Sequence, residues 1–518
     1  MSERKRTQFP LRAALTSFTV LLGTCVLIYT LLWFSDFGLH IWAANPYVLF
    51  REPGAVDTLT SFSEVTVGVL GIAITVVAII VELAATRYTP RITELFLNDT
   101  VNRAVMSYFV ITSVLVVWIN QSLFGPMHPA NMALAASFLM TTSLIAILPY
   151  FAYVFDFLSP TSVILRIEWN GSNRISRLAR GKMTTKRART DVATAVEQLG
   201  DIALNSVDKK DKPLTIAALN ALAEVARTHI ESKEKLPDDW FDSSVLVRTD
   251  QDFIAFHPDI VTTLTLRKTW VEMKILRQYQ AVFVEAVNKL RDINHLIAIH
   301  TRRIAFIALD HNDEHVLDLC MRFINTYMRA AVNARDVRTC YNLLNEYRAL
   351  AERAVELGND EVALETANKI KYYAQLAFSA NLGFILESAA YDLCELIENA
   401  SDKGATCHDE LLEIFLDVDR EPEGGKVQET SLRGVRKAQI KLATHYLIRE
   451  KTAPAKRIYE DMKSEQISRM VALRRELEAV QGAEFWEVSD RGVNFEWLAP
   501  ERRATLDTFF GFWDETIG

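Results

Sequence analysis

This chain of 518 residues has little glycine, proline and cysteine, and each scarcity excludes a class of protein. Gly occurs 19 times and Pro 14 times. These counts lie well below ordinary usage, which argues against β-sandwiches, collagen-like chains and long disordered linkers and favours helix. The five cysteines include no C-x-x-C pair, which excludes a disulfide scaffold and the common zinc modules. The net charge of −8 argues against a dedicated nucleic-acid binder.

Motifs for catalysis are also missing from the sequence. There is no G-x-x-x-x-G-K-[ST] and no G-x-G-x-x-G, so the usual cradles for ATP and for a dinucleotide are absent. There is no G-x-S-x-G nucleophile elbow. We therefore expect no enzyme and no bound cofactor. Four cysteines fall in a region expected to face a reducing compartment, and they fit core thiols better than reactive ones: Cys320, Cys340, Cys394 and Cys407.

The N-terminal third of the chain is far more apolar than the rest. Over the whole chain, half of the residues are hydrophobic and 24% are charged. The apolar residues are concentrated in four long runs within the N-terminal third. A helix that crosses a bilayer needs about 20 apolar residues, within a range of about 17–25. The runs therefore predict an all-α transmembrane domain over 1–159 with spans at about 11–33, 64–83, 104–123 and 130–157.

The distribution of cations predicts the orientation of the four spans. Basic residues precede span one, recur between spans two and three, and follow span four, whereas Arg51 is the one cation between spans one and two. Because cationic loops stay in the cytoplasm, we expect a multi-pass membrane protein with both termini in the cytoplasm. The alternative is a signal peptide over span one, but its charge-free run exceeds the usual 7–15 residues.

A short phrase between spans two and three contains Ala84, Ala85, Thr86, Tyr88, Thr89, Pro90, Arg91 and Asn102. With these residues the chain resembles a bacterial family of uncharacterised predicted membrane proteins. The resemblance covers about residues 60–225 and implies a protein of a bacterial inner membrane, with four spans followed by a cytoplasmic helical domain. It carries no catalytic residues. A capped loop is one interpretation of the phrase, since Pro disfavours helix in the residue before it, and a gating elbow is the other. The motif residues are Arg87, Tyr88, Thr89, Pro90, Arg91 and Asn102.

Span two carries a narrow stripe of small residues with an acid at each end. At about 100° per residue, its six members fall within about 40° of one line along the helix. Small stripes allow helices to pack closely, whereas rings of Glu at the mouths of an oligomeric pore would favour cations. The stripe consists of Glu64, Gly68, Gly71, Thr75, Ala78 and Glu82.

The residues after span four form a basic juxtamembrane segment over 160–190. Cations beside a membrane attract anionic lipid headgroups by about 1 kcal/mol each. We expect lipid-surface contact from Arg166, Arg174, Arg177, Arg180, Lys182, Lys186, Arg187 and Arg189.

Residues 191–518 read as a cytoplasmic α-helical domain. Helical periodicity dominates, and short polar turns such as 356–361 predict antiparallel neighbours. Three segments share a plan of helix end, Asn/Asp turn and new helix, but Leu204, Leu309 and Leu357 are separated by 105 and 48 residues. Since a regular solenoid keeps one period, we expect irregularly stacked helical hairpins.

One histidine pair could in principle bind a metal. His311 and His315 are four residues apart, but the Glu between them stands at the wrong position for the motif H-E-x-x-H. A helix N-terminus capped by Asn312 or Asp313 explains the cluster better.

Two functional hypotheses follow from these features. The first is an oligomeric channel-like protein in which span two lines a cation path and the cytoplasmic domain regulates it. The second is a membrane-anchored helical scaffold that docks a protein partner and transports nothing. The expected partners are the lipid bilayer with its anionic headgroups, further copies of the chain, and a protein bound by the cytoplasmic domain; nucleic acid is not expected.

Overall fold

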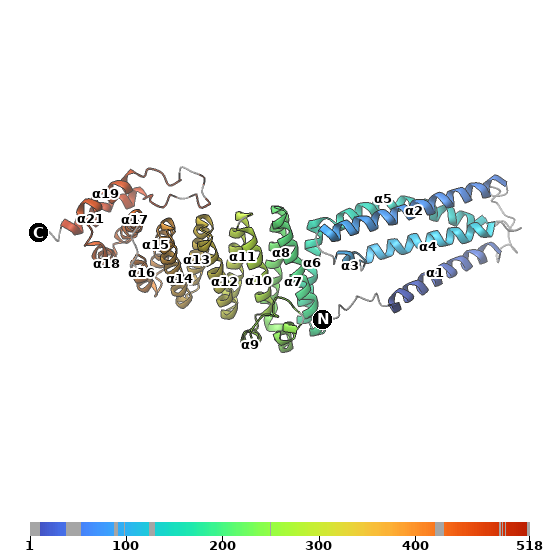
Figure 1. Cartoon of the computed structure of the whole chain (residues 1–518), viewed down its shortest axis with the longest axis horizontal. Coiled ribbons are helices and arrows are strands. Elements are labelled where there is room, and N and C mark those ends of the chain that lie inside the picture. Colours follow the sequence, from blue (N-terminus) through green and yellow to red (C-terminus); the bar gives the residue numbers. More distant parts are fainter. Residues whose placement is uncertain are drawn as a thin grey trace. The chain divides into compact units, whose positions relative to one another are not determined.

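The protein is all-α, as the sequence predicts, and folds as two compact units that meet in the sequence at Leu165 and Arg166 (Figure 1). The part of the chain that the structure describes contains no β-strand. The computed structural model describes residues 11–37, 53–87, 92–97, 99–123, 130–248, 250–287, 289–419, 429–485, 488, 490–492 and 494–514.

Among the described residues of the first unit, four helices are long and apolar enough to cross a membrane. Their apolar windows are Thr19–Asp36, Thr60–Thr86, Thr100–Ser122 and Asn131–Phe157, which agrees with the four predicted spans. The second helix begins earlier than predicted, at Pro53, because Pro suits the first turn of a helix. The elements are α1 (Leu11–Phe37), α2 (Pro53–Arg87), the short α3 (Ile92–Leu97), α4 (Thr100–Leu123) and α5 (Ala130–Phe157).

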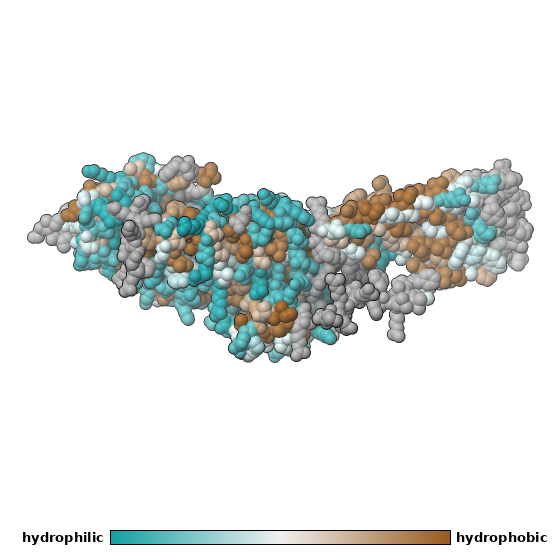
Figure 2. Space-filling view, viewed as in Figure 1, coloured by the Kyte–Doolittle hydropathy of each residue, from teal (hydrophilic) through white to brown (hydrophobic). Residues whose placement is uncertain are grey.

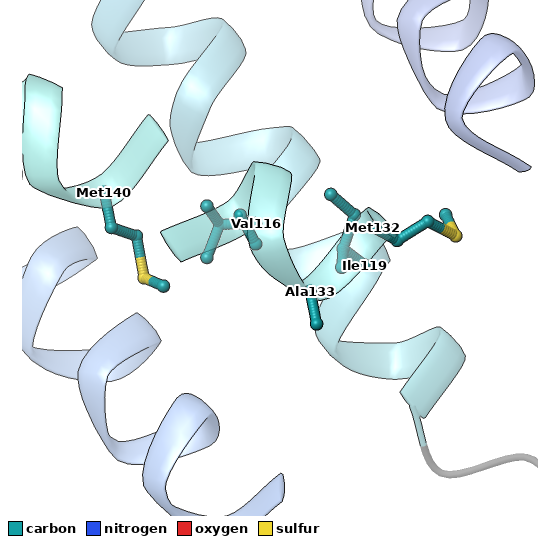
Figure 3. Close-up of a cluster of buried hydrophobic side chains, with 6 residues drawn as sticks. Val116, Ile119, Met132, Ala133 and Met140 are labelled. Carbon is teal, nitrogen blue, oxygen red and sulfur yellow. The ribbon is translucent and has the colours of Figure 1, made fainter. Parts of the chain in front are cut away.

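The α4–α5 pair forms the centre of this unit, and α1 and α2 each pack against it. Figure 3 shows the apolar cluster between α4 and α5, which includes Val116, Ile119, Met132, Ala133 and Met140. Tyr29 and Leu32 of α1 pack against the same cluster. Much of the remaining apolar surface of the unit is exposed (Figure 2), which suits helices surrounded by lipid.

A buried carboxylate ties α1 to the start of α5. Asp36 accepts hydrogen bonds from the backbone N–H groups of Asn131, at 3.0 Å, and Met132, at 2.9 Å. The first N–H groups of a helix have no partner within the helix, and the positive end of the helix dipole favours an anion there. Asp36 therefore caps α5 from another span.

The second unit is built from packed helices joined mostly by short turns. One row of neighbours consists of α8, α11, α13, α15 and α17, and most of the remaining helices pack behind it. The helices are α6 (Pro160–Ala179), α7 (Thr185–Asp208), α8 (Lys212–Ser232), α9 (Pro258–Arg267), α10 (Trp270–Ala286), α11 (Arg291–Asp310), α12 (Glu314–Asn333), α13 (Val337–Glu356), α14 (Asp360–Ser379), α15 (Gly383–Lys403), α16 (His408–Leu416), α17 (Glu429–Ile448), α18 (Thr452–Met462), α19 (Ile467–Ala479), α20 (Pro500–Ala504) and α21 (Leu506–Asp514).

The last four hairpins keep a regular period that the leucine spacings conceal. Their first helices, α11, α13, α15 and α17, each begin 46 residues after the one before. The turn inside each hairpin contains a left-handed residue at the same interval, namely Asn312, Gly358, Gly404 and Glu450. The irregular part of the stack lies before α11. There, the 3-10 turns and α9 between Lys233 and Arg267 form a lobe that separates α8 from α10 in the sequence.

Helical periodicity over 262–309 predicts one long helix, and the structure shows that this prediction is wrong. The structure breaks this stretch at Lys268, which is left-handed at φ 56°, and again before Arg291. The first break turns Trp270 into the core, where its indole N–H donates to the carbonyl of Trp240 at 3.0 Å. Neither Gly nor Pro marks this break, so no local signal predicts it.

Candidate functional site

The stripe on α2 lies on the side of the helix turned away from its contacts with α4 and α5. The face of α2 that packs on α4 and α5 is buried at Ser63, Thr66, Leu70, Ala73, Val77, Val81 and Ala84. At about 100° per residue, the centre of that buried face lies about 140° around the helix from the stripe. All six members of the predicted stripe, Glu64, Gly68, Gly71, Thr75, Ala78 and Glu82, are exposed.

The middle of the stripe leaves polar backbone open to an incoming group. A Cβ added at Gly68 or Gly71 would meet nothing within 4 Å. The hydroxyl of Thr75 donates to the carbonyl of Gly71 at 2.9 Å, which leaves the hydroxyl oxygen able to accept. The stripe can therefore either receive another helix closely or present oxygen atoms to a cation.

The acids of the stripe lie near the two ends of the membrane-spanning stretch. Glu64 and Glu82 are 18 residues apart, which corresponds to about 27 Å along a helix. The hydrocarbon core of a bilayer is about 30 Å thick. An exposed carboxylate near each edge of that core costs free energy unless it faces protein or water.

A pocket of about 610 Å³ adjoins the Glu82 end of the stripe. Its walls come from α2, α3 and α4, and Ala78 and Glu82 of the stripe belong to its lining. The other lining residues are mostly apolar, with Phe96 and Leu97 from α3 and Met106 from α4. The pocket thus extends the exposed stripe sideways as a largely apolar groove.

A hydrogen-bonded cluster around Asn102 holds α3 against the ends of α4 and α5. The side chain of Asn102 donates to the carbonyl of Phe96 at 3.0 Å and accepts from the hydroxyl of Tyr150 at 2.7 Å. Asp99 accepts from the backbone N–H of Asn102 at 3.0 Å and from the hydroxyl of Tyr153 at 2.5 Å. Asn102 is buried, so the cluster is a rigid clamp beside the pocket.

The structure places the predicted loop motif only in part. Arg87 is the last residue of α2, which agrees with a helix stop before the Thr-Pro step. Asn102 joins the clamp described above. Tyr88, Thr89, Pro90 and Arg91 lie outside the described residues.

Some side chains of the basic segment are exposed, and others are partly buried or contact other residues of the protein. The Nε atom of Arg174 lies 3.1 Å from a carboxylate oxygen of Asp191, and Arg166 is half-buried. Arg189 must be removed from the lipid-surface set, because it is buried and donates to the carbonyl of Asp239. Burial lowers the pKa of Arg189, while the carboxylates of Asp242 and Asp239 oppose that shift. The exposed members are Arg177, Arg180, Lys182, Lys186 and Arg187.

The two histidines do not share a helix. α11 ends at Asp310, so His311 lies in the turn and His315 in α12. Asp313 caps α12 by accepting from the N–H of Val316 at 3.1 Å, as the capping interpretation predicts. Within the described part of the chain, no group of three His, Cys, Asp or Glu residues is placed to hold a metal ion.

The described cysteines are all free and buried. Burial raises the pKa of Cys340 and Cys407 to about 12. Such thiols stay protonated near neutral pH and are poor nucleophiles, which agrees with their interpretation as core residues.

Sequence-based prediction missed the partners of Asn102 in the clamp and the acid that caps α5. Asp99 stands directly before α4, where an N-cap acid is common, and this position was a usable signal. Tyr150 and Tyr153 are three residues apart and so share a face of α5. Tyr residues near the end of a membrane helix also fit an interfacial aromatic belt, and that pattern does not indicate their specific partners. Asp36 gave no local signal, because its partners lie on another span.

These features define a class: a helical membrane protein with four candidate spans and a solenoid of helical hairpins. Residues 11–229 match a family described as "Predicted membrane protein (DUF2254)", whose function is uncharacterised. This match confirms the resemblance seen over residues 60–225. The chain matches no curated protein and no solved structure.

Proposed function

We propose that this membrane protein assembles into a homo-oligomer in which α2 of each copy lines a path for cations. The observation that carries the proposal is the exposure of the whole stripe from Glu64 to Glu82 on a single chain. Because α4 and α5 cover the opposite side of α2, another copy is the natural partner of the stripe. Closed cyclic assemblies are the usual outcome when identical chains associate through one surface.

The chemistry of the stripe supports cations over anions. One carboxylate per copy at each end would form two acidic rings, which attract cations to the mouths of a pore. Between them, the hydroxyl oxygen of Thr75 and the uncovered backbone near Gly68 and Gly71 supply neutral acceptors. The Val, Leu and Ile residues elsewhere on α2 offer no such acceptors.

The orientation in this proposal follows the distribution of basic residues. Both termini lie in the cytoplasm of a bacterium, with Glu64 toward the periplasm and Glu82 toward the cytoplasm. The solenoid is then a cytoplasmic regulatory domain, joined to the last span through α6. The pocket beside Glu82 and the clamp around Asn102 then lie at the cytoplasmic end of the path.

Planar-bilayer recording of the purified oligomer tests the proposal. We expect a cation-selective current under some combination of voltage, membrane tension and pH. Replacing Glu82 by Gln should move the reversal potential toward zero in a salt gradient, because one negative charge per copy is removed. A folded oligomer that passes no current under any of these conditions contradicts the channel function.

The second candidate is a membrane-anchored scaffold, and one observation favours it. The solenoid presents a row of neighbouring helices, α11, α13, α15 and α17, of the kind that repeat proteins use as a binding surface. In the scaffold hypothesis, the stripe would have packed against another span of its own chain. The exposure of Gly68 and Gly71 argues against that packing and makes the channel the first candidate.

A further inference from the structure

A non-helical segment near the C-terminus lies across three helices of the solenoid row. We call it the strap, and it comprises the described residues of 480–499. It follows α19 and precedes α20, and its polar contacts run to α13, α15 and α17.

The acidic end of the strap is held by α13. Asp490 accepts two hydrogen bonds from Arg338, at 2.7 and 2.8 Å, and one from Asn342 at 2.8 Å. The hydrogen bond from Arg338 is the main cause that lowers the pKa of Asp490 to about 2. A carboxylate with these partners stays ionised throughout the physiological range.

The next residue, Arg491, fits between α13 and α15. Its guanidinium makes a two-pronged contact with the buried carboxylate of Asp392, at 2.8 and 3.0 Å. The Tyr341 ring covers the guanidinium at 4.1 Å from the ring centroid. Paired N–H donors and an aromatic face suit Arg specifically and fit Lys poorly.

The far end of the strap is held by α15 and α17. Phe495 stacks on Tyr391 with ring centroids 5.0 Å apart, and its carbonyl accepts from Lys441 at 2.9 Å. Glu496 pairs with Lys437 at 2.6 Å. The surface therefore accepts an acid, an arginine, an aromatic ring and a second acid in that order.

The strap fills this surface incompletely. A pocket of about 890 Å³ remains between the strap and the helices, lined by Arg335, Phe384, Glu387 and Phe485 among others. Among the described residues, Glu387 has no hydrogen-bond or ion-pair partner. The side chain of Val488 in the strap is fully exposed. An occupant with more side-chain volume and a cation for Glu387 would fit the surface better.

We infer that this face of α13, α15 and α17 is a binding site for an extended protein segment, with the strap as its resident occupant. The partner is a segment with the strap's order of acid, arginine, aromatic and acid, and with an added basic residue that reaches Glu387. It takes the site by displacing the strap. This inference gives the scaffold function its binding face and is independent of the ion path.

Binding of a labelled peptide to the full-length protein in detergent tests this site. The probe is the strap itself, residues 482–498, followed by fluorescence anisotropy. In wild type the resident strap competes with the probe. Replacing Arg491 by Ala in the chain loosens that strap, while Arg348 still lies 3.1 Å from Asp392. We expect the probe to bind the R491A protein at least tenfold more tightly than wild type.

A charge exchange shows whether the probe occupies the proposed site. Adding R338D to the R491A protein should abolish binding of the normal probe and restore binding of a probe that carries D490R. Arg338 is exposed, so this change spares the core, and an unchanged melting temperature verifies folding. Equal probe affinity for wild type and R491A, or no response to the exchange, overturns the inference. A protein partner found on another face would still support the scaffold.

Discussion

The hydroxyl of Tyr150 on α5 donates a 2.7 Å hydrogen bond to the side-chain carbonyl of Asn102 on α4, inside the membrane unit. The same Asn102 side chain donates to the carbonyl of Phe96, at the end of α3. One buried amide thus joins three helices beside the pocket that contains Glu82. This junction determines the position of α3 relative to the Glu82 end of the stripe.

Replacing Asn102 by Ala should destabilise the membrane unit. The change leaves the Tyr150 hydroxyl without its partner, and a buried polar group without a partner costs about 1–3 kcal/mol. The Phe96 carbonyl loses one of its two hydrogen bonds and keeps the one from the backbone N–H of Asp99 at 3.2 Å. We expect a lower melting temperature for the detergent-purified protein. Tyr150→Phe is the matched control: it removes only one bond and should have the smaller effect. Equal stability of N102A and wild type would show that the clamp contributes nothing.

Cysteine labelling should report the predicted topology. A cysteine in place of Met127, between spans three and four, should react with a membrane-impermeant maleimide in intact cells. A cysteine in place of Leu95, between spans two and three, should react only after the membrane is permeabilised. The described native cysteines are buried, so the background should be low. Labelling of the residue-95 cysteine in intact cells refutes the orientation.

Anionic lipid should bind the exposed members of the basic segment. Replacing Arg177, Arg180 and Lys182 by Gln removes three cations that are each worth about 1 kcal/mol of lipid attraction. Native mass spectrometry of the full-length protein titrated with phosphatidylglycerol should then show fewer bound lipids. The difference should shrink with salt, since exposed charges are screened over about 8 Å at physiological ionic strength.

The control for lipid binding is Arg174→Gln, because Arg174 already lies beside Asp191. It should retain nearly the wild-type number of lipids. If the triple variant and this control bind lipid equally, the cations determine topology alone.

The stability of the solenoid should depend on pH through Glu387. Burial, with a smaller contribution from Glu496, raises its pKa from 4.5 to about 7, although Lys437 opposes the shift. The folded state therefore holds this proton more tightly than the unfolded state does. The contribution of Glu387 to stability is greatest below about pH 4.5, falls as the pH rises toward about 7, and then levels off.

Glu387→Gln isolates this pH dependence. The difference in melting temperature between E387Q and wild type should grow in favour of E387Q between about pH 4.5 and 7. Other carboxylates, such as Asp490, titrate alike in both proteins and cancel. If the difference in melting temperature stays constant across this range, the raised pKa of Glu387 is contradicted.

The sequence predicted the features that depend on local pattern. Four apolar runs predicted the membrane helices, and helical periodicity placed Gly68, Gly71 and Thr75 on one line. The periodicity could not decide what covers that line, because the answer depends on which face of α2 meets α4 and α5.

Long-range features escaped sequence reasoning for physical reasons. The 46-residue period depends on a shared left-handed backbone, which Asn312, Gly358, Gly404 and Glu450 adopt with three different residue types. The strap depends on pairs such as Arg491 and Asp392, which are 99 residues apart in the chain. Neither feature has a contiguous motif.

Single-channel recording of Thr75→Leu against Val76→Leu tests the central claim most directly. Both substitutions add apolar bulk on α2, but residue 76 points about 100° away from residue 75 around the helix. We expect T75L to abolish or sharply reduce the cation current of an intact oligomer, whereas V76L should conduct like wild type. Wild-type current through T75L, or equal loss in both variants, would contradict a path lined by the Glu64–Glu82 stripe.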